Sequence, residues 1–99
     1  MVEVRQTDRY ARWFGRLRDP VARGRILARI RRLSLGNPGD IRPVGWGVGE
    51  MRVDYGPGYR VYFANRGSRL VVLLAGGDKR TQAADILAAR ELAALLEET

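Results

Sequence analysis

The chain has 99 residues, enough for one hydrophobic core but too few for two, so we expect a single domain over residues 1–99. Hydrophobic residues make up 45% and charged residues 29%, which is typical of a soluble globular domain. No apolar run approaches the roughly 20 residues of a membrane span, so we expect no membrane association. The net charge of +7 predicts a polyanionic partner. The first ten residues lack the layout of a secretory signal, and there is no cysteine, so we expect a cytoplasmic protein.

The first third of the chain predicts one strand and two helices. Residues 2–6 alternate as in a strand, and Thr7 is a typical N-cap for a helix over residues 8–18. Asp19 followed by proline is a second start signal, for a helix that ends near Ser34. We expect the two helices to form an antiparallel hairpin. Their predicted buried faces carry Tyr10, Trp13, Phe14 and Leu17 in the first helix, and Ala22, Ile26, Ile30 and Leu33 in the second.

The remainder predicts a loop, three strands and a helix. Residues 36–47 are rich in glycine and proline without any periodicity, which is typical of a loop. The β-branched and aromatic segments 48–55, 59–66 and 68–75 are joined by glycine-containing turns, as in an antiparallel meander. A helix begins at Thr81, with Ile86, Ala89, Ala93 and Leu96 on one face. The predicted class is α+β, with the order β-α-α-β-β-β-α and the meander packed on the helical hairpin.

Alternation along the first two meander strands separates their side chains into two sets. One set is expected in the core and contains Met51, Val53, Val61 and Phe63. The other set is expected on the opposite face and contains Glu50, Arg52, Asp54, Arg60 and Tyr62. Arg52 and Arg60 then become cross-strand neighbours, provided that the Gly-Pro-Gly connection holds an odd number of residues. Because adjacent guanidinium groups repel each other, the pair favours a phosphate site on this face.

The third meander strand leads through Gly76 and Gly77 into Asp78, Lys79 and Arg80. A glycine pair lets the backbone come close to a ligand, and backbone N–H groups at the start of the next helix favour phosphate. An ordinary strand-to-helix turn with solvated charges is an equally good interpretation of these residues.

The absence of histidine and cysteine narrows the range of catalytic mechanisms that the protein could use. It excludes a Ser–His dyad, a cysteine nucleophile and a histidine-based zinc site, and the carboxylates form no tight cluster in sequence. We therefore expect neither a metal nor another cofactor. What remains is an arginine and lysine site, which can cleave RNA by orienting the ribose 2′-hydroxyl for attack on its own phosphate and by stabilising the developing charge. DNA lacks this hydroxyl, so such chemistry would be specific for RNA.

Two segments carry a family resemblance that covers nearly the whole chain. RLSLGNPGDIRPVGWGVGEMRVDYGPGYRVYF (residues 32–63) and LVVLLAGGDKRTQAADI (residues 70–86), after a helical hairpin, resemble the HigB-like addiction module killer proteins of the RelE/ParE toxin superfamily. The resemblance implies the β-α-α-β-β-β-α fold and cleavage of messenger RNA, commonly on the ribosome. It also implies a partner antitoxin with a helix-turn-helix domain, and operator DNA bound only through the antitoxin complex.

The resemblance also assigns a candidate catalytic site. The arginine of the family's GYR segment falls on Arg60, a basic residue of the preceding strand on Arg52, and the basic residue after the last strand on Lys79 or Arg80. These four residues are the predicted catalytic site. Glu50 stands where well-known ribosome-dependent members have a second lysine, and Ile86 stands near their tyrosine, so the family's acid and base do not transfer. The candidates for general acid and base here are Lys79, Glu50 and Tyr62.

Two other functions remain open at this point. The superfamily also contains ParE-like proteins that poison DNA gyrase without cutting RNA, and fold alone does not distinguish the two activities. A non-enzymatic nucleic-acid-binding module could instead use the arginine-rich second helix. We interpret those arginines as docking charge for RNA or the ribosome, or for an acidic antitoxin segment, with a solvated helix face as the alternative. The residues concerned are Arg25, Arg29 and Arg32.

Overall fold

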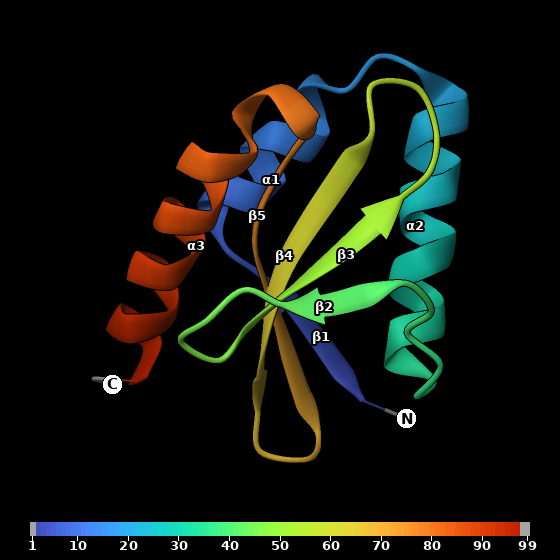
Figure 1. Ribbon diagram of the computed structural model, residues 1–99. Coiled ribbons are helices and arrows are strands. Elements are labelled where there is room, and N and C mark those ends of the chain that lie inside the picture. Colours follow the sequence, from blue (N-terminus) through green and yellow to red (C-terminus); the bar gives the residue numbers. More distant parts are fainter. Residues whose placement is uncertain (1, 98–99) are drawn as a thin grey trace.

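A five-stranded mixed sheet runs through the centre of the structure, a computed structural model that describes residues 2–97 (Figure 1). In chain order the elements are β1 (Glu3–Gln6), α1 (Asp8–Arg16), α2 (Pro20–Ser34), β2 (Ile41–Pro43), β3 (Val48–Val53), β4 (Tyr59–Arg66), β5 (Leu70–Gly77), the 3-10 helix η1 (Lys79–Thr81) and α3 (Gln82–Glu97). The strand order is β1-β5-β4-β3-β2. The predicted α+β class is confirmed. Residues 1, 98 and 99 of the predicted domain lie outside the described residues.

The register of the sheet places the two candidate strand arginines opposite each other. β1 pairs in parallel with β5, whereas β2, β3, β4 and β5 pair with antiparallel neighbours. In the β3–β4 pair Arg52 lies opposite Arg60, and Val53 opposite Tyr59. The connection over residues 54–58 therefore has an odd length, and the predicted cross-strand arginine pair is confirmed.

Side-chain caps start the first two helices where the sequence predicts. Thr7 accepts a hydrogen bond of 3.1 Å from the Tyr10 backbone N–H at the start of α1. Asp19 accepts bonds from the N–H groups of Val21 (2.9 Å) and Ala22 (3.3 Å), and Pro20 occupies the first turn of α2. Each cap satisfies backbone donors that the first turn of a helix leaves free. α1 ends at residue 16, two residues earlier than predicted.

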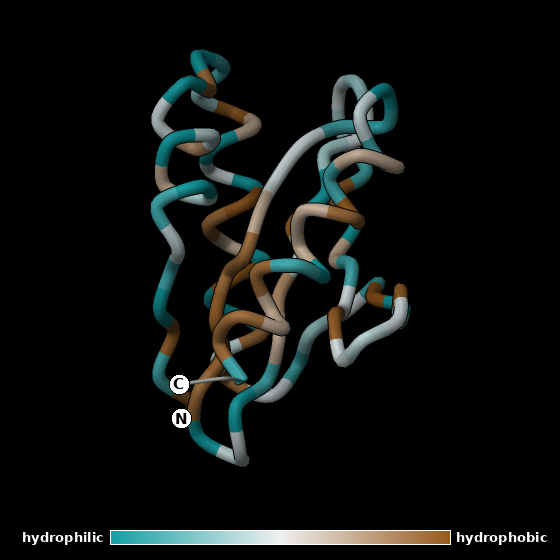
Figure 2. Tube along the Cα trace, turned by 90° about the vertical axis from the view of Figure 1, so that its left-hand side faces the viewer, coloured by the Kyte–Doolittle hydropathy of each residue, from teal (hydrophilic) through white to brown (hydrophobic). Residues whose placement is uncertain are grey.

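Helices cover both faces of the sheet. α1 and α2 pack on one face around Tyr10, Ile26, Met51, Val61 and Phe63, as helical periodicity predicts for the first two residues and strand alternation for the other three. α3 packs on the opposite face, where the second core cluster contains Val48, Tyr62, Ala64, Val72, Leu74, Ala75, Ala89 and Ala93. In Figure 2 the hydrophobic segments concentrate in the central strands, between the helical layers. None of the helices within residues 2–97 is long and apolar enough to cross a membrane.

The second core corrects one prediction about the sheet. We expected the face that carries Glu50, Arg60 and Tyr62 to be open, but Glu50 and Tyr62 are fully buried and only 12% of the Arg60 side chain is exposed. Alternation along β3 and β4 separates the two faces correctly. It contains no information about whether a distant helix covers the second face, and here α3 does so.

The predicted loop over residues 36–47 contains the short edge strand β2, a second correction. Ile41, Arg42 and Pro43 pair with β3, and three residues are too few to give a periodic signal. Arg29 holds this segment against the sheet, donating 3.1 and 3.3 Å hydrogen bonds to the carbonyls of Pro38 and Asp40. A third bond, of 2.6 Å, reaches the Arg52 carbonyl.

Boundaries in the second half differ from prediction by about two residues. β3 ends at Val53, and β5 runs from Leu70 to Gly77 because both of its final glycines remain paired with β4. Thr81 ends η1, and α3 begins one residue after it.

The Gly76-Gly77 pair serves packing within the protein. A Cβ atom on Gly76 would lie 2.1 Å from the indole of Trp13, and one on Gly77 would lie 1.9 Å from the Asp85 carboxylate. Both glycines also line an open cavity, so the expectation that they admit a ligand to the backbone stays a prediction. Their missing side chains leave room for Trp13 on one side of β5 and Asp85 on the other.

Replacing Gly76 with alanine should lower the free energy of unfolding by about 1–3 kcal/mol, because the indole of Trp13 has to move. Gly24→Ala is the matched control. Gly24 lies in α2 with nothing within 4 Å of the added Cβ, so this change should raise stability by about 0.5–1 kcal/mol. Urea denaturation of both variants measures the difference. Equal stability of Gly76→Ala and the parent protein would contradict the tight packing of Trp13.

Candidate functional site

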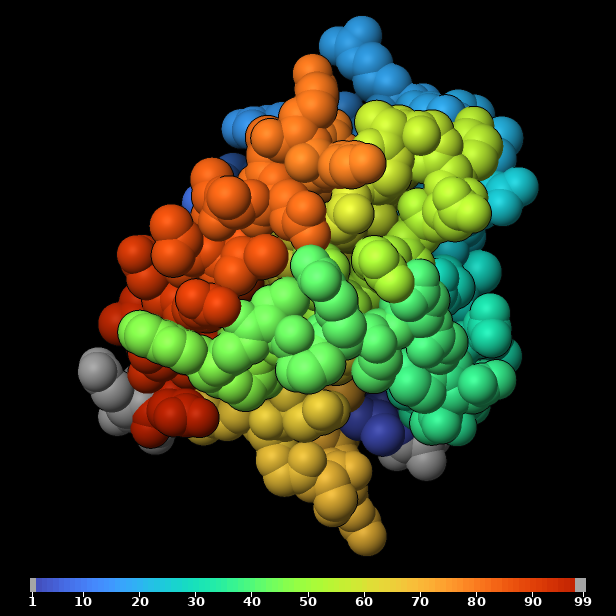
Figure 3. Space-filling model, in the orientation of Figure 1, coloured from blue at the N-terminus to red at the C-terminus, as the bar shows by residue number. Residues whose placement is uncertain are grey.

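An open cavity of about 440 Å³ lies where the β3–β4 turn meets η1, and we call it the Arg60 cavity. Its walls bring together three cations from three elements, namely Arg52 of β3, Arg60 of β4 and Lys79 of η1. Asp40 and Asp54 line it as well, together with the Gly56-Pro57-Gly58 turn and Tyr59. In Figure 3 the yellow-green β3–β4 turn and the orange η1 segment adjoin each other at the surface.

Arg60 is held in place by its neighbours. Its Nη1 donates a 2.8 Å hydrogen bond to the Gly58 carbonyl, and its Nε lies 3.5 Å from Oε2 of Glu50 without the geometry of a hydrogen bond. Because most of the side chain is buried, few other rotamers are available to it. The guanidinium is therefore fixed at the cavity wall before any ligand arrives.

Glu50 is the centre of a buried hydrogen-bond network behind Arg60. It accepts hydrogen bonds from Arg42 Nε (2.8 Å), the Tyr62 hydroxyl (3.0 Å) and Gln82 Nε2 (2.8 Å). Burial raises the pKa of the Glu50 carboxyl, but these three donors outweigh burial and hold that pKa below its ordinary value. The carboxylate is thus charged and satisfied inside the protein.

Neither Glu50 nor Tyr62 lines the Arg60 cavity, although the sequence predicts both as general acid or base candidates. Burial, and then the hydrogen bond to Glu50, raise the pKa of Tyr62. Tyr62 therefore stays protonated while Glu50 stays ionised. Their geometry suits them to position Arg60 rather than to exchange protons with a substrate.

Arg52 is more exposed than Arg60 and has a carboxylate partner. Its Nη2 donates a 3.0 Å hydrogen bond to Asp40, and this interaction raises the pKa of the Arg52 guanidinium. Asp40 comes from the segment before β2 that Arg29 anchors. Part of the repulsion between Arg52 and Arg60 is thereby offset inside the protein.

Lys79 and Asp54 complete the polar lining of the Arg60 cavity. Both residues are exposed, and neither side chain makes an ion pair or hydrogen bond with another of residues 2–97. A lysine can donate a proton and a carboxylate can accept one, whereas arginine stays protonated. The cavity therefore holds two arginines that stay positively charged and two groups that are able to exchange protons.

Arg80, the fourth predicted catalytic residue, does not join the other three. Its Nη2 pairs with Asp78 at 3.1 Å, and 84% of its side chain is exposed on the other side of η1. A short helical turn sends successive side chains in different directions, so Lys79 and Arg80 line different cavities.

The three arginines predicted for RNA or ribosome docking lie together along α2. Arg25, Arg29 and Arg32 line a shallow groove of about 290 Å³ whose far wall is Val53 and Asp54. Because these two residues also line the Arg60 cavity, the basic surface is continuous from β4 to α2. Arg29 uses its guanidinium for backbone carbonyls, whereas Arg25 lies 5.0 Å from the centre of the Tyr55 ring.

Sequence reasoning missed Gln82 and Arg42 as partners of Glu50, and Asp40 as partner of Arg52. No local pattern links Gln82 to a strand 32 residues earlier. Arg42 could have been found only after recognising β2, which places it directly opposite Glu50.

The fold and the site define a small basic α+β domain with a cation-lined cavity at the end of its sheet. No family model matches the chain. An uncharacterized protein of Haemophilus influenzae is 46% identical over 92 residues, which cover 93% of each chain. The chain belongs to the same family as this Haemophilus influenzae protein.

Proposed function

We propose that this protein is the toxin of a type II toxin–antitoxin pair, a HigB-like member of the RelE/ParE superfamily that cleaves messenger RNA without a metal. The observation that carries the proposal is the meeting of Arg52, Arg60 and Lys79 in one cavity. The sequence resemblance and the order of strands and helices support the RelE-like assignment within the α+β class. The protein would act in the cytoplasm.

The Arg60 cavity offers what in-line RNA cleavage needs. Arg60 and Arg52 would hold the scissile phosphate and stabilise the extra negative charge that builds on its oxygens during attack. Arg60 makes the larger contribution because burial and the Gly58 carbonyl hold its guanidinium in place, whereas the Arg52 side chain is more exposed. Their roles are thus electrostatic and positional.

Proton transfer falls to the two exposed groups of the cavity. The ribose 2′-oxygen forms a bond to phosphorus as the bond from phosphorus to the 5′-oxygen breaks, which leaves a 2′,3′-cyclic phosphate. Asp54 takes the proton from the 2′-hydroxyl, and Lys79 gives a proton to the departing 5′-oxygen. No redox partner is required, and the hydroxyl requirement makes RNA the substrate.

The partners follow from the same assignment. The continuous basic surface over Arg25 and Arg32 would dock on ribosomal RNA, with messenger RNA in the Arg60 cavity. A cognate helix-turn-helix antitoxin would neutralise the toxin by covering the cavity. Operator DNA would then be bound through that complex alone.

Induced expression without the antitoxin should arrest growth, reduce protein synthesis and create new ends within transcripts. Pulse labelling of protein and mapping of transcript ends after induction measure the effect, and Lys79→Ala is the comparison expected to be much less active. If transcripts stay intact while DNA breaks accumulate, the target is gyrase and the proposal is wrong. If neither change occurs, the proposal is also contradicted, and a non-enzymatic nucleic-acid-binding module becomes the better assignment.

A further inference from the structure

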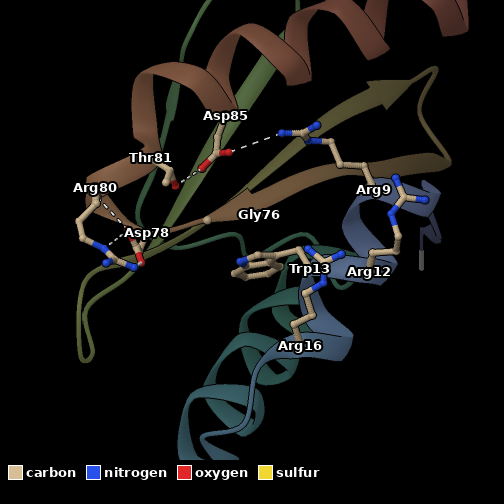
Figure 4. A pocket seen from close by; sticks show the side chains of 10 residues that line it. Arg9, Arg12, Trp13, Arg16, Gly76, Asp78, Arg80, Thr81 and Asp85 are labelled. Carbon is tan, nitrogen blue, oxygen red and sulfur yellow. Dashed lines mark hydrogen bonds and ion pairs between the residues drawn. The ribbon is translucent and has the colours of Figure 1, made fainter.

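A second cavity, of about 520 Å³, lies on the other side of η1, and we call it the Arg12 cavity (Figure 4). Successive turns of α1 each contribute one arginine to the wall of this cavity. The spacing of Arg9, Arg12 and Arg16 (i, i+3, i+7) puts all three on one side of the helix. The indole of Trp13 lies between them and Gly76, as Figure 4 shows.

Carboxylates neutralise part of this lining, but two arginines remain unpaired. Arg9 lies 3.8 Å from Asp85, whose other oxygen accepts a 2.5 Å hydrogen bond from Thr81, and Arg80 is paired with Asp78. Arg12 and Arg16 make no ion pair or hydrogen bond with any other residue in 2–97. Two like charges one turn apart repel each other, so an anion placed between them would be stabilised by both.

The two cavities share a wall. Lys79 of η1 lines the Arg60 cavity, and Arg80, the next residue, lines the Arg12 cavity. Tyr59 lines the first and Trp13 the second, and their ring centres are 6.4 Å apart in an edge-on contact. A strand bound at the Arg60 cavity would thus meet an aromatic ring and a second set of arginines on leaving it. This combination of cations and aromatic rings is the one that single-stranded nucleic acids need.

We propose that the Arg12 cavity is a second phosphate-binding site, which takes a backbone phosphate of the single RNA strand whose scissile phosphate lies in the Arg60 cavity. Arg12 and Arg16 bind the phosphate oxygens, and the accessible edge of the Trp13 indole contacts the adjoining nucleotide. This path of the RNA strand, from the Arg60 cavity to the Arg12 cavity, rests on the proposed function. The second site lengthens the interface with RNA and would hold the substrate in register for cleavage.

The test uses the purified full chain and a fluorescent, 2′-O-methylated RNA dodecamer of mixed sequence, which binds but is not cut. Arg12→Gln/Arg16→Gln should weaken binding about tenfold per arginine, the loss expected for one hydrogen bond to a charged group. The slope of log affinity against log salt concentration should fall by about 0.7 for each phosphate that the variant no longer neutralises. Arg31→Gln/Arg69→Gln is the matched control, since it removes the same charge from exposed positions in α2 and the β4–β5 turn.

Tryptophan fluorescence locates the binding site. The chain has two tryptophans, so Trp46→Phe leaves Trp13 as the only emitter. The dodecamer should change Trp13 emission in this background, at concentrations that rise when Arg12 and Arg16 are replaced. Inorganic phosphate alone should bind far more weakly than the dodecamer, and comparable affinity would indicate a site for a free anion instead of a strand.

The arms of the experiment separate the two proposals. If Arg12→Gln/Arg16→Gln binds the dodecamer as the control does, the Arg12 cavity is not part of the RNA path and this inference is overturned. If Arg60→Gln is the variant without effect, the proposed function fails, while weaker binding by Arg12→Gln/Arg16→Gln would still support a phosphate site in the Arg12 cavity. Circular dichroism and thermal melting confirm that each variant is folded.

Discussion

Arg60→Ala is expected to lower the rate of RNA cleavage by about 100- to 1,000-fold, the usual loss when one preorganised donor to a developing charge is removed. Arg60 is buried against Glu50 and fixed by the Gly58 carbonyl, so its guanidinium needs no rearrangement when the substrate binds. Toxicity in cells and cleavage of transcripts on purified ribosomes measure the effect.

Loss of activity in Arg60→Ala has to be separated from loss of fold. Removing Arg60 takes a positive charge away from the buried Glu50, so some destabilisation accompanies the change. Lys79→Ala avoids this problem, because Lys79 is exposed and makes no polar contact within residues 2–97. It should lose about 100-fold in rate while its melting temperature stays that of the parent protein. Full activity of both variants would place the site elsewhere, and Arg69→Ala should behave as the parent protein does.

Glu50→Ala is expected to cost about 3–5 kcal/mol of stability, the usual loss when one member of a buried charged network is removed. The change removes the fully buried acceptor that Tyr62, Gln82 and Arg42 share; the Tyr62 hydroxyl is left buried without a partner, whereas the half-exposed Arg42 can turn to water. For a domain of this size, such a loss lowers the melting temperature by tens of degrees at about 4–8 °C per kcal/mol. Thermal and urea denaturation measure it, and a loss below about 1 kcal/mol would contradict the network.

Glu50→Gln adds a test based on pH. The folded protein holds the pKa of Glu50 below its ordinary value, so the carboxylate stabilises the fold above the pKa of the unfolded chain. That contribution is lost as the pH falls through the lowered pKa of the folded state. The stability difference between the parent protein and Glu50→Gln should therefore be greatest near neutral pH and shrink in acid. A difference that grows in acid would show that the pKa is raised instead.

Local patterns predicted most of the fold because its local signals are strong. Thr7 and Asp19 cap their helices as expected, since each provides an oxygen to backbone donors two or three residues away. The pairing of Arg52 with Arg60 followed from alternation and the length of one turn. These features depend on neighbours in sequence or across a single hairpin.

Features that depend on contacts between distant segments could not be predicted from local sequence patterns. The burial of Glu50 and Tyr62 depends on α3, and the parallel pairing of β1 with β5 joins residues more than 60 positions apart. The edge strand β2 is held by Arg29 and by pairing with β3, without a pattern of its own. Tertiary contacts decide such elements, and alternation or helical periodicity carries no signal for them.

In the candidate site too, the residues could be predicted from the sequence, whereas the contacts that depend on the fold could not. Arg52, Arg60 and Lys79 could be named from the sequence, and they line one cavity. The separation of Arg80 depends on the turn of η1. The assistance that Gln82 and Arg42 give to Arg60 through Glu50 depends on side-chain packing, so it becomes visible only in the folded protein.

The central claim is that the Arg60 cavity cleaves RNA through the ribose 2′-hydroxyl. Chemical analysis of the ends of the cleavage products tests this claim most directly. A messenger RNA is translated on purified ribosomes with the purified protein, and the ends of the fragments are identified chemically. We expect a 2′,3′-cyclic phosphate upstream of the cut and a 5′-hydroxyl downstream, and a single 2′-deoxy nucleotide at the cut position should abolish cleavage. Fragments with 3′-hydroxyl and 5′-phosphate ends, or cleavage that continues at the 2′-deoxy position, would contradict this mechanism.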